Sequence, residues 1–144
     1  MTAVRRLALL GSALALVGTL AACGGSSTSS SSEAQIKSAY ETFFSPKTSL
    51  AGRVAVLQNG EQFKPVIKSF AGNPLAPSVT VTVPSVTLEG ANKAKVVYVI
   101  KFAGTALPKQ NGTAVRQNGT WKVGYPSLCK LVALQGSTPS ACKP

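Results

Sequence analysis

The sequence predicts an α+β domain in which N-terminal helices pack on a strongly bent antiparallel sheet and a short helix closes the chain. Two observations lead to this prediction. Apolar residues recur at helical spacing from about residue 33 to residue 71, and apolar and polar residues then alternate from Val79 to Val123. Because the helical patterns precede the strand patterns instead of alternating with them, helices and strands are expected to form separate layers.

The first predicted helix begins at Ser32, since Ser32 and Gln35 match a capping box. It ends near Ser45-Pro46, because the residue before a proline is disfavoured in a helix. Its apolar side chains follow spacings of three and four residues and therefore form one stripe toward the core. They are Ile36, Ala39, Tyr40, Phe43 and Phe44.

Two shorter helices are predicted next. The second helix has one apolar face and ends at the stop signal Gln58-Asn59-Gly60. The third spans residues 61–71, where Pro65 is compatible only with the first turn, and Gly72 ends it. The inward-facing residues of the two helices are Leu50, Val54, Leu57, Phe63, Val66, Ile67 and Phe70.

Strands follow from the alternating pattern. The valines of residues 79–83 share one face, and the parity of the apolar residues slips after Pro84-Ser85. A bulge or bend at that point would keep both halves of the strand facing the core. A turn at residues 89–93 then leads to a strand at residues 95–102. Its inward-facing side chains are Val96, Tyr98, Ile100 and Phe102.

The last two strands meet at Asn118-Gly119, a pair typical of two-residue hairpin turns. A two-residue loop would place Arg116 opposite Trp121. A three-residue loop with Gly119 in the left-handed conformation would instead place Val115 and Trp121 on one apolar face. The face pattern therefore predicts the three-residue loop.

Residues 1–22 have the layout of a secretory signal: a basic start, an apolar run too short to span a bilayer, and small residues at its end. Leu20-Ala21-Ala22-Cys23 resembles the bacterial lipobox, so Cys23 is expected to carry the lipid. Residues 24–32 are expected to form a Gly/Ser-rich tether, and residues 33–144 one domain. Arg5-Arg6 leaves twin-arginine export open beside the favoured general secretory route.

Once the leader is removed, 13 Lys and Arg stand against 4 Glu. The resulting basic surface either attracts anionic lipid head groups and wall polymers or is an ordinary solvated face. With Cys23 acylated, Cys129 and Cys142 remain as a pair in an oxidising compartment and are predicted to form a disulfide. Cys129 lies in a predicted terminal helix at residues 127–134.

The sequence contains few candidate catalytic residues. The sequence contains no His and no Asp, and its four carboxylates fall at predicted helix faces, helix starts or turns. These are Glu33, Glu41, Glu61 and Glu89. The sequence therefore lacks the side chains that metal, paired-carboxylate and histidine-triad mechanisms require, and it contains no cofactor motif. No basic-aromatic motif indicates nucleic acid.

Four aromatic residues, Tyr40, Phe44, Tyr98 and Trp121, have two interpretations. They could line an apolar pocket, because a helix packed across a curved sheet often leaves a cavity at its open end. Core packing also explains all four residues, and the sequence favours this interpretation over the pocket.

Three segments, residues 54–67, 85–100 and 106–134 with Cys142 behind them, resemble the mycobacterial low-molecular-weight secreted antigen family. The most specific is ALPKQNGTAVRQNGTWKVGYPSLCKLVAL. The resemblance implies a cone-shaped fold of the nuclear transport factor two and cystatin type. It also implies an exported protein of undetermined biochemical role.

The expected function is that of a non-catalytic lipoprotein of the actinobacterial type, held at the outer face of the cell membrane, partly shed, and binding a ligand or partner there. The alternative is an accessory protein that docks anionic lipid or wall polymer through a basic face. A small-molecule enzyme of the ketosteroid-isomerase-like fold ranks third, because the strands that would supply its carboxylate base offer none.

Overall fold

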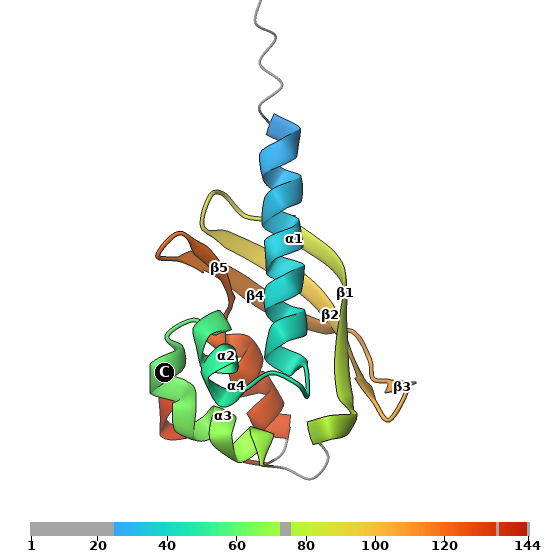
Figure 1. Cartoon of the computed structure of the whole chain (residues 1–144), viewed down its shortest axis with the longest axis vertical. Helices are drawn as coiled ribbons and strands as arrows, with labels where there is room; N and C mark the ends of the chain where they lie inside the picture. The colour runs from blue at the N-terminus through green and yellow to red at the C-terminus, as the bar shows by residue number, and fades with distance from the viewer. Residues whose placement is uncertain (1–24, 73–75, 135, 144) are drawn as a thin grey trace, which may run out of the picture.

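The computed structural model describes residues 25–72, 76–134 and 136–143 (Figure 1). The predicted leader at residues 1–22 and the lipidation site at Cys23 lie outside the described residues. Within the described part, none of the helices combines the length and the apolar character needed to cross a membrane.

The helical elements are α1 (Gly25–Phe44), α2 (Leu50–Val56), η1 (Gly60–Phe63), α3 (Lys64–Ala71), η2 (Ala76–Ser78), α4 (Tyr125–Leu134) and η3 (Ser140–Cys142). The strands are β1 (Val79–Leu88), β2 (Lys93–Phe102), β3 (Thr105–Ala106), β4 (Gln110–Gln117) and β5 (Thr120–Val123). Neighbouring strands are antiparallel in the order β1-β2-β4-β5, and the short β3 pairs with β2. Helices precede and follow the antiparallel strands along the chain, which confirms the predicted α+β class.

The sheet is strongly bent around α1. Helix α1 crosses one face of the sheet, while α2, α3 and α4 gather toward its C-terminal end (Figure 1). Although β1 and β5 are the two outer strands of the order, both contact α1. A flat sheet could not bring both edges to one helix, so the sheet curls as predicted.

Helix α1 starts at Gly25, seven residues before the predicted capping box at Ser32. The expected tether at residues 24–32 is therefore largely the first two turns of the helix, and Gln35 Nε2 donates to Ser31 Oγ at 3.3 Å instead of capping from N3. Once the downstream stripe anchors a helix, each added residue gains a backbone hydrogen bond, and serine is only a moderately poor helix former.

Helices α2 and α3 agree with the predictions. The Ser49 hydroxyl caps α2 by accepting from the Gly52 amide at 3.1 Å, and the stop signal ends in a left-handed Asn59 with a φ of 53°. Pro65 lies in the first turn of α3, where its missing amide costs nothing, and Gly72 caps the other end.

The bulge in β1 is confirmed. Its register against β2 shifts between Thr82 and Ser85, so Val83 before the shift and Val86 and Leu88 after it all reach the core cluster. The bulge offsets the one-residue slip in the apolar alternation at Pro84, so that the apolar residues on both sides of it face the core.

The predicted three-residue hairpin loop is wrong. Arg116 pairs with Trp121 across a two-residue loop, with Asn118 at φ 53° and Gly119 at φ 78°. Both positive φ values suit a type I′ turn, whose twist matches that of the strands. The prediction failed because it required Val115 to face the core, whereas the small Ala114 occupies that position.

Candidate functional site

Three of the four singled-out aromatic residues form the centre of the core. Tyr40, Phe44 and Tyr98 contact one another, with ring centroids 5.2 Å apart for Tyr40 and Tyr98 and 5.8 Å apart for Phe44 and Tyr98. Tyr98 is only 1% exposed. The rings fill the space under α1 that a pocket would need, so the core-packing interpretation describes these three residues.

A buried hydrogen-bond network holds the Tyr40 hydroxyl. The hydroxyl donates to the Thr113 carbonyl at 2.8 Å and lies 3.1 Å from Ser127 Oγ. Ser127 Oγ in turn accepts from the Thr113 amide at 3.2 Å. Burial raises the pKa of Tyr40 far above its ordinary value, although the Ser127 hydrogen bond opposes the shift. Burial alone raises the pKa of Tyr98 to about 12. Both phenols are therefore neutral structural groups.

Gly112 makes this network possible. A Cβ atom on Gly112 would clash with the Tyr40 hydroxyl and stand 2.7 Å from Ser127 Oγ and 2.8 Å from Tyr98 Cε1. Only glycine lets β4 approach the two tyrosines this closely. The sequence marked neither Gly112 nor Ser127, because a glycine in a strand and a serine in a short helix carry no signal of a distant partner.

Trp121 is the fourth aromatic residue and has a different setting. It is 3% exposed and forms the floor of an open hollow of about 460 Å³ between α1, α2 and β5. Side chains of α1, most of them small, line one side of the hollow, and Val56 and Thr120 complete the lining. The α1 residues are Ser31, Ala34, Gln35, Ser38, Ala39 and Thr42.

The outer face of the sheet carries the lysines. Lys93, Val115 and Lys122 are directly opposite one another on β2, β4 and β5, and Lys95 lies two residues along β2 on the same face. Lys93 and Lys95 are exposed and Lys122 is partly buried. We call Lys93, Lys95 and Lys122 the lysine triangle. The inward-facing residues predicted for residues 95–102 leave Lys95 and Lys101 on the outer face, but the wrong hairpin register hid the alignment of Lys122 with Lys93.

Negative charge is sparse around the triangle. Glu89, in the turn before β2, pairs with Lys95 at 2.6 Å and raises the pKa of that ammonium group through a hydrogen bond and its charge. Among the described residues, Lys93 and Lys122 have no carboxylate within ion-pair distance. Two positive charges of the triangle are therefore uncompensated.

Glu41 and Glu61, the carboxylates that an enzyme with an internal base would need to bury, both face solvent. Glu41 is exposed, and Glu61 is exposed with its side chain 3.5 Å from Lys64 Nζ. The part of the chain that the structure describes contains no cluster of three or more His, Cys, Asp or Glu side chains that could hold a metal ion.

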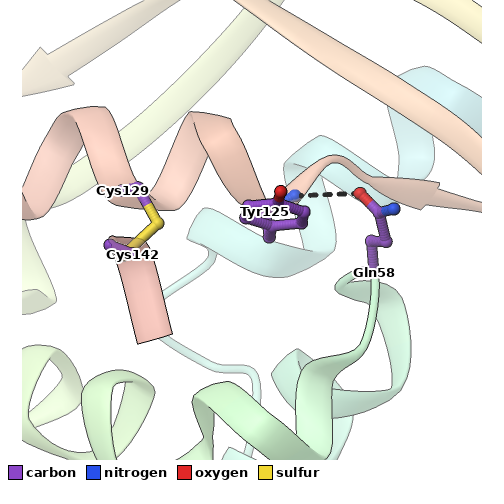
Figure 2. Close-up of a disulfide and its surroundings, with 4 residues drawn as sticks. All are labelled: Gln58, Tyr125, Cys129 and Cys142. Carbon is purple, nitrogen blue, oxygen red and sulfur yellow. Dashed lines mark hydrogen bonds between the residues drawn. A yellow bond between two sulfur atoms is a disulfide. The ribbon is translucent and has the colours of Figure 1, made fainter. Parts of the chain in front are cut away.

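The predicted disulfide is present (Figure 2). Cys129 of α4 and Cys142 of η3 are bonded, with their Cα atoms 5.5 Å apart. The backbone amide of Tyr125, at the start of the same helix, donates to Gln58 Oε1 at 3.4 Å. The bridge and this contact attach the C-terminal segment to α4 and α4 to the α2–η1 connection.

Arg53 is a buried cation that the sequence did not indicate. It is 5% exposed, its Nη2 donates to the Ser45 carbonyl at 2.8 Å, and its Nε has no partner among the described atoms. Desolvation lowers its pKa. The contact ties α2 to the end of α1, which gives this arginine a structural role.

Fold and site together define a small disulfide-bonded α+β domain with a filled aromatic core, a shallow hollow beside Trp121 and a basic outer sheet face. The chain belongs to the family described as low molecular weight antigen MTB12, C-terminal domain, whose profile matches residues 29–139. The resemblance seen in the sequence is thereby confirmed. Comparison with curated proteins gave no match.

Two solved structures are similar at low identity. A structure described as a putative NTF2-like transpeptidase from Campylobacter jejuni aligns with a TM-score of 0.45 and 11% identity, covering 64% of this chain and 95% of that one. The intermembrane space region of the chloroplast protein ARC6 aligns with a TM-score of 0.36 and 11% identity, covering 69% of this chain and 92% of that one.

Proposed function

We propose that this protein is a lipid-anchored, non-catalytic component of the bacterial cell envelope that docks an anionic surface through the outer face of its sheet. The anchor is the diacylglycerol on Cys23. The docked surface consists of anionic lipid head groups or wall polymer. Membership of an antigen family supports an extracellular or envelope location.

The observation that carries the proposal is the lysine triangle. Its three ammonium groups lie on one exposed face with a single carboxylate, Glu89, beside them. Basic residues near an anionic surface contribute about 1 kcal/mol each, so a group of three on one face is enough to orient a protein that a lipid already holds nearby.

The filled core favours docking over binding of a ligand inside the domain. Tyr98 lies within the packed rings, whereas Trp121 borders the open hollow. An interior site would require the rings to separate, at the cost of buried apolar contacts.

The anchor is tested by Cys23→Ser. Sulfur is the group that the transferase alkylates, so the variant is expected to leave the detergent phase while the unchanged chain stays in it. Cys129→Ser with Cys142→Ser is the control, because it also replaces cysteines, those of the disulfide, but leaves Cys23. Normal detergent partitioning of Cys23→Ser would refute the anchor.

Docking is tested with the Cys23→Ser chain, which has no lipid to hold it. Binding to vesicles containing phosphatidylglycerol, or to isolated anionic wall polymer, is expected and should weaken as salt is added, because the Debye length shortens. Binding that neither needs anionic groups nor responds to salt would contradict the proposal.

A second candidate function is binding of a small apolar ligand in the hollow beside Trp121. Its volume of about 460 Å³ falls in the range of small-molecule sites. Trp121 is the only tryptophan, so its fluorescence reports on this hollow alone. Native mass spectrometry of the protein purified from its own envelope should show a bound mass that Ala34→Trp, which fills the hollow, removes.

A further inference from the structure

We infer that the lysine triangle is the membrane-facing end of the domain and that its partner is the head-group layer of the same anionic bilayer that holds the lipid on Cys23. This inference rests on the proposed function and adds to it an orientation and a single partner. It follows from where α1 begins and from which end of the sheet the lysines occupy.

The N-terminal half of α1 and the β4–β5 hairpin lie at the same end of the molecule. Ser31 and Gln35 of α1 line one hollow together with Thr120 and Trp121, the first residues after the hairpin turn. The other turn at this end is the β1–β2 connection, because the Arg116 amide donates to the Asn92 carbonyl at 2.8 Å. Figure 1 shows both turns near the upper part of α1.

The triangle occupies this end of the sheet. Lys93 is the first residue of β2, directly after the β1–β2 turn, and Lys122 is three residues past the second turn residue, Gly119. Lys101, on the same face of the same strand as Lys95, is at the opposite end beside β3. The outer face therefore has a basic cluster at the end where α1 begins, and Lys101 lies at the other end.

The helical start of α1 limits how far the domain can stand from its anchor. Cys23 precedes Gly25 by two residues, which span at most about 7 Å. From Gly25 to Ser31, level with the hairpin, the helix rises about 9 Å. A flexible tether of nine residues would allow any face to meet the membrane, whereas this short connection keeps one end of the sheet close to it.

These lengths place the triangle within reach of head groups. Together the two lengths come to at most about 16 Å, roughly two Debye lengths at physiological ionic strength, so a tilt of α1 is needed to bring the lysines into contact with the head groups. The half-buried Val115 between Lys93 and Lys122 adds an apolar centre to the contact.

The first test maps exposed lysines on the unchanged, acylated protein in vesicles. An amine-reactive label is applied in phosphatidylcholine vesicles with and without phosphatidylglycerol. We expect Lys93, Lys95 and Lys122 to become protected only when the anionic lipid is present, while Lys101 stays reactive. Equal labelling of all four in both vesicles, or protection of Lys101 instead, would overturn the inference.

The second test compares two charge-matched variants in the Cys23→Ser chain. Lys93→Gln with Lys95→Gln and Lys122→Gln should weaken vesicle binding by roughly a hundredfold, since each lysine near an anionic surface contributes about fivefold. Lys68→Gln with Lys101→Gln and Lys109→Gln removes the same charge and should weaken it severalfold at most. If the first variant does not fold, the labelling of the unchanged protein decides.

The outcomes separate this inference from the proposed function. Equal losses in both triple variants would overturn the orientation and leave docking in place. Binding to isolated wall polymer without binding to anionic vesicles would overturn the lipid partner and again leave docking in place. Absence of binding to either would refute the docking function and this inference together.

Discussion

The inner and outer faces of the sheet are made by alternate residues of the same strands, yet the residues on the two faces differ in burial and in charge. On β2, Tyr98 faces inward and is buried against other rings, while its neighbour Val97 faces outward and stays half-exposed. On β4, Gly112 faces the tyrosines and Asn111 faces solvent. Stability resides on the inner face, which leaves the outer face free to carry charge.

The comparison also explains where function is to be sought. The packed rings of Tyr40, Phe44 and Tyr98 fill the inside of the cone. The outer face retains lysines that the fold does not require. Substitutions on the two faces should therefore separate folding from binding.

The largest difference is expected at adjacent positions of β2. Tyr98→Ala should lower the free energy of unfolding by about 3–5 kcal/mol, because it opens a cavity among packed rings. Val97→Ala, the matched control on the outer face, should lower it by less than about 1 kcal/mol. Denaturant titration measures both. Equal losses would mean that the outer face is covered in solution.

Removing the disulfide should have the next largest effect and should spare the inner face. Its closed loop spans a sequence separation of 13 residues, so reduction should cost about 2–4 kcal/mol. Proteolysis after Leu134 should accelerate before the strands are cut, since low-stability segments open first. Free thiols appearing on unfolding without reductant, or strand cleavage first, would contradict this.

Gly112→Ala tests the close approach of β4 to the tyrosines. The added methyl must displace the Tyr40 hydroxyl or the Tyr98 ring, so a loss of about 1–3 kcal/mol is expected. Asn111→Ala, one residue earlier and facing outward, is the control and should change stability by no more than about 0.5 kcal/mol. A tolerated Gly112→Ala would show that this contact is looser than described.

The last effect is absent at neutral pH and appears under alkaline conditions. The pKa of Tyr98 is raised to about 12 in the folded chain, while an unfolded tyrosine ionises near 10. The folded state thus holds its proton where the unfolded state loses it, so stability should decline as pH rises from about 10 to about 12. Tyr98→Phe should flatten that decline in unfolding curves. An unchanged slope would exclude Tyr98 as its source.

Sequence patterns were sufficient for elements whose signals are local. Pro65 in a first turn, the left-handed Asn59 after α2 and the parity slip at Pro84-Ser85 each follow from backbone constraints within a few residues. The cysteine pair followed from counting thiols in an exported chain. In each case the residues that carry the signal are the ones that form the feature, or lie within a few residues of it.

The two failures have distant causes. The hairpin register depended on whether Val115 or Ala114 meets the core, and the buried Ala114 shares its face of β4 with Gly112, which packs against Tyr40 and Tyr98. The start of α1 at Gly25 depended on helix propagation from a stripe anchored on the sheet. Neither partner is visible in a local window.

By itself the sequence determined the class of fold, the order of its elements, the disulfide and a strongly basic balance, because periodicity, turn residues and composition act locally or in bulk. Only the tertiary structure decided that the aromatic residues close the core, that Lys93 and Lys122 align across β4, and that these lysines lie at the end of the sheet nearest the N-terminal half of α1. Those features depend on which side chains meet across long separations, and packing alone selects them.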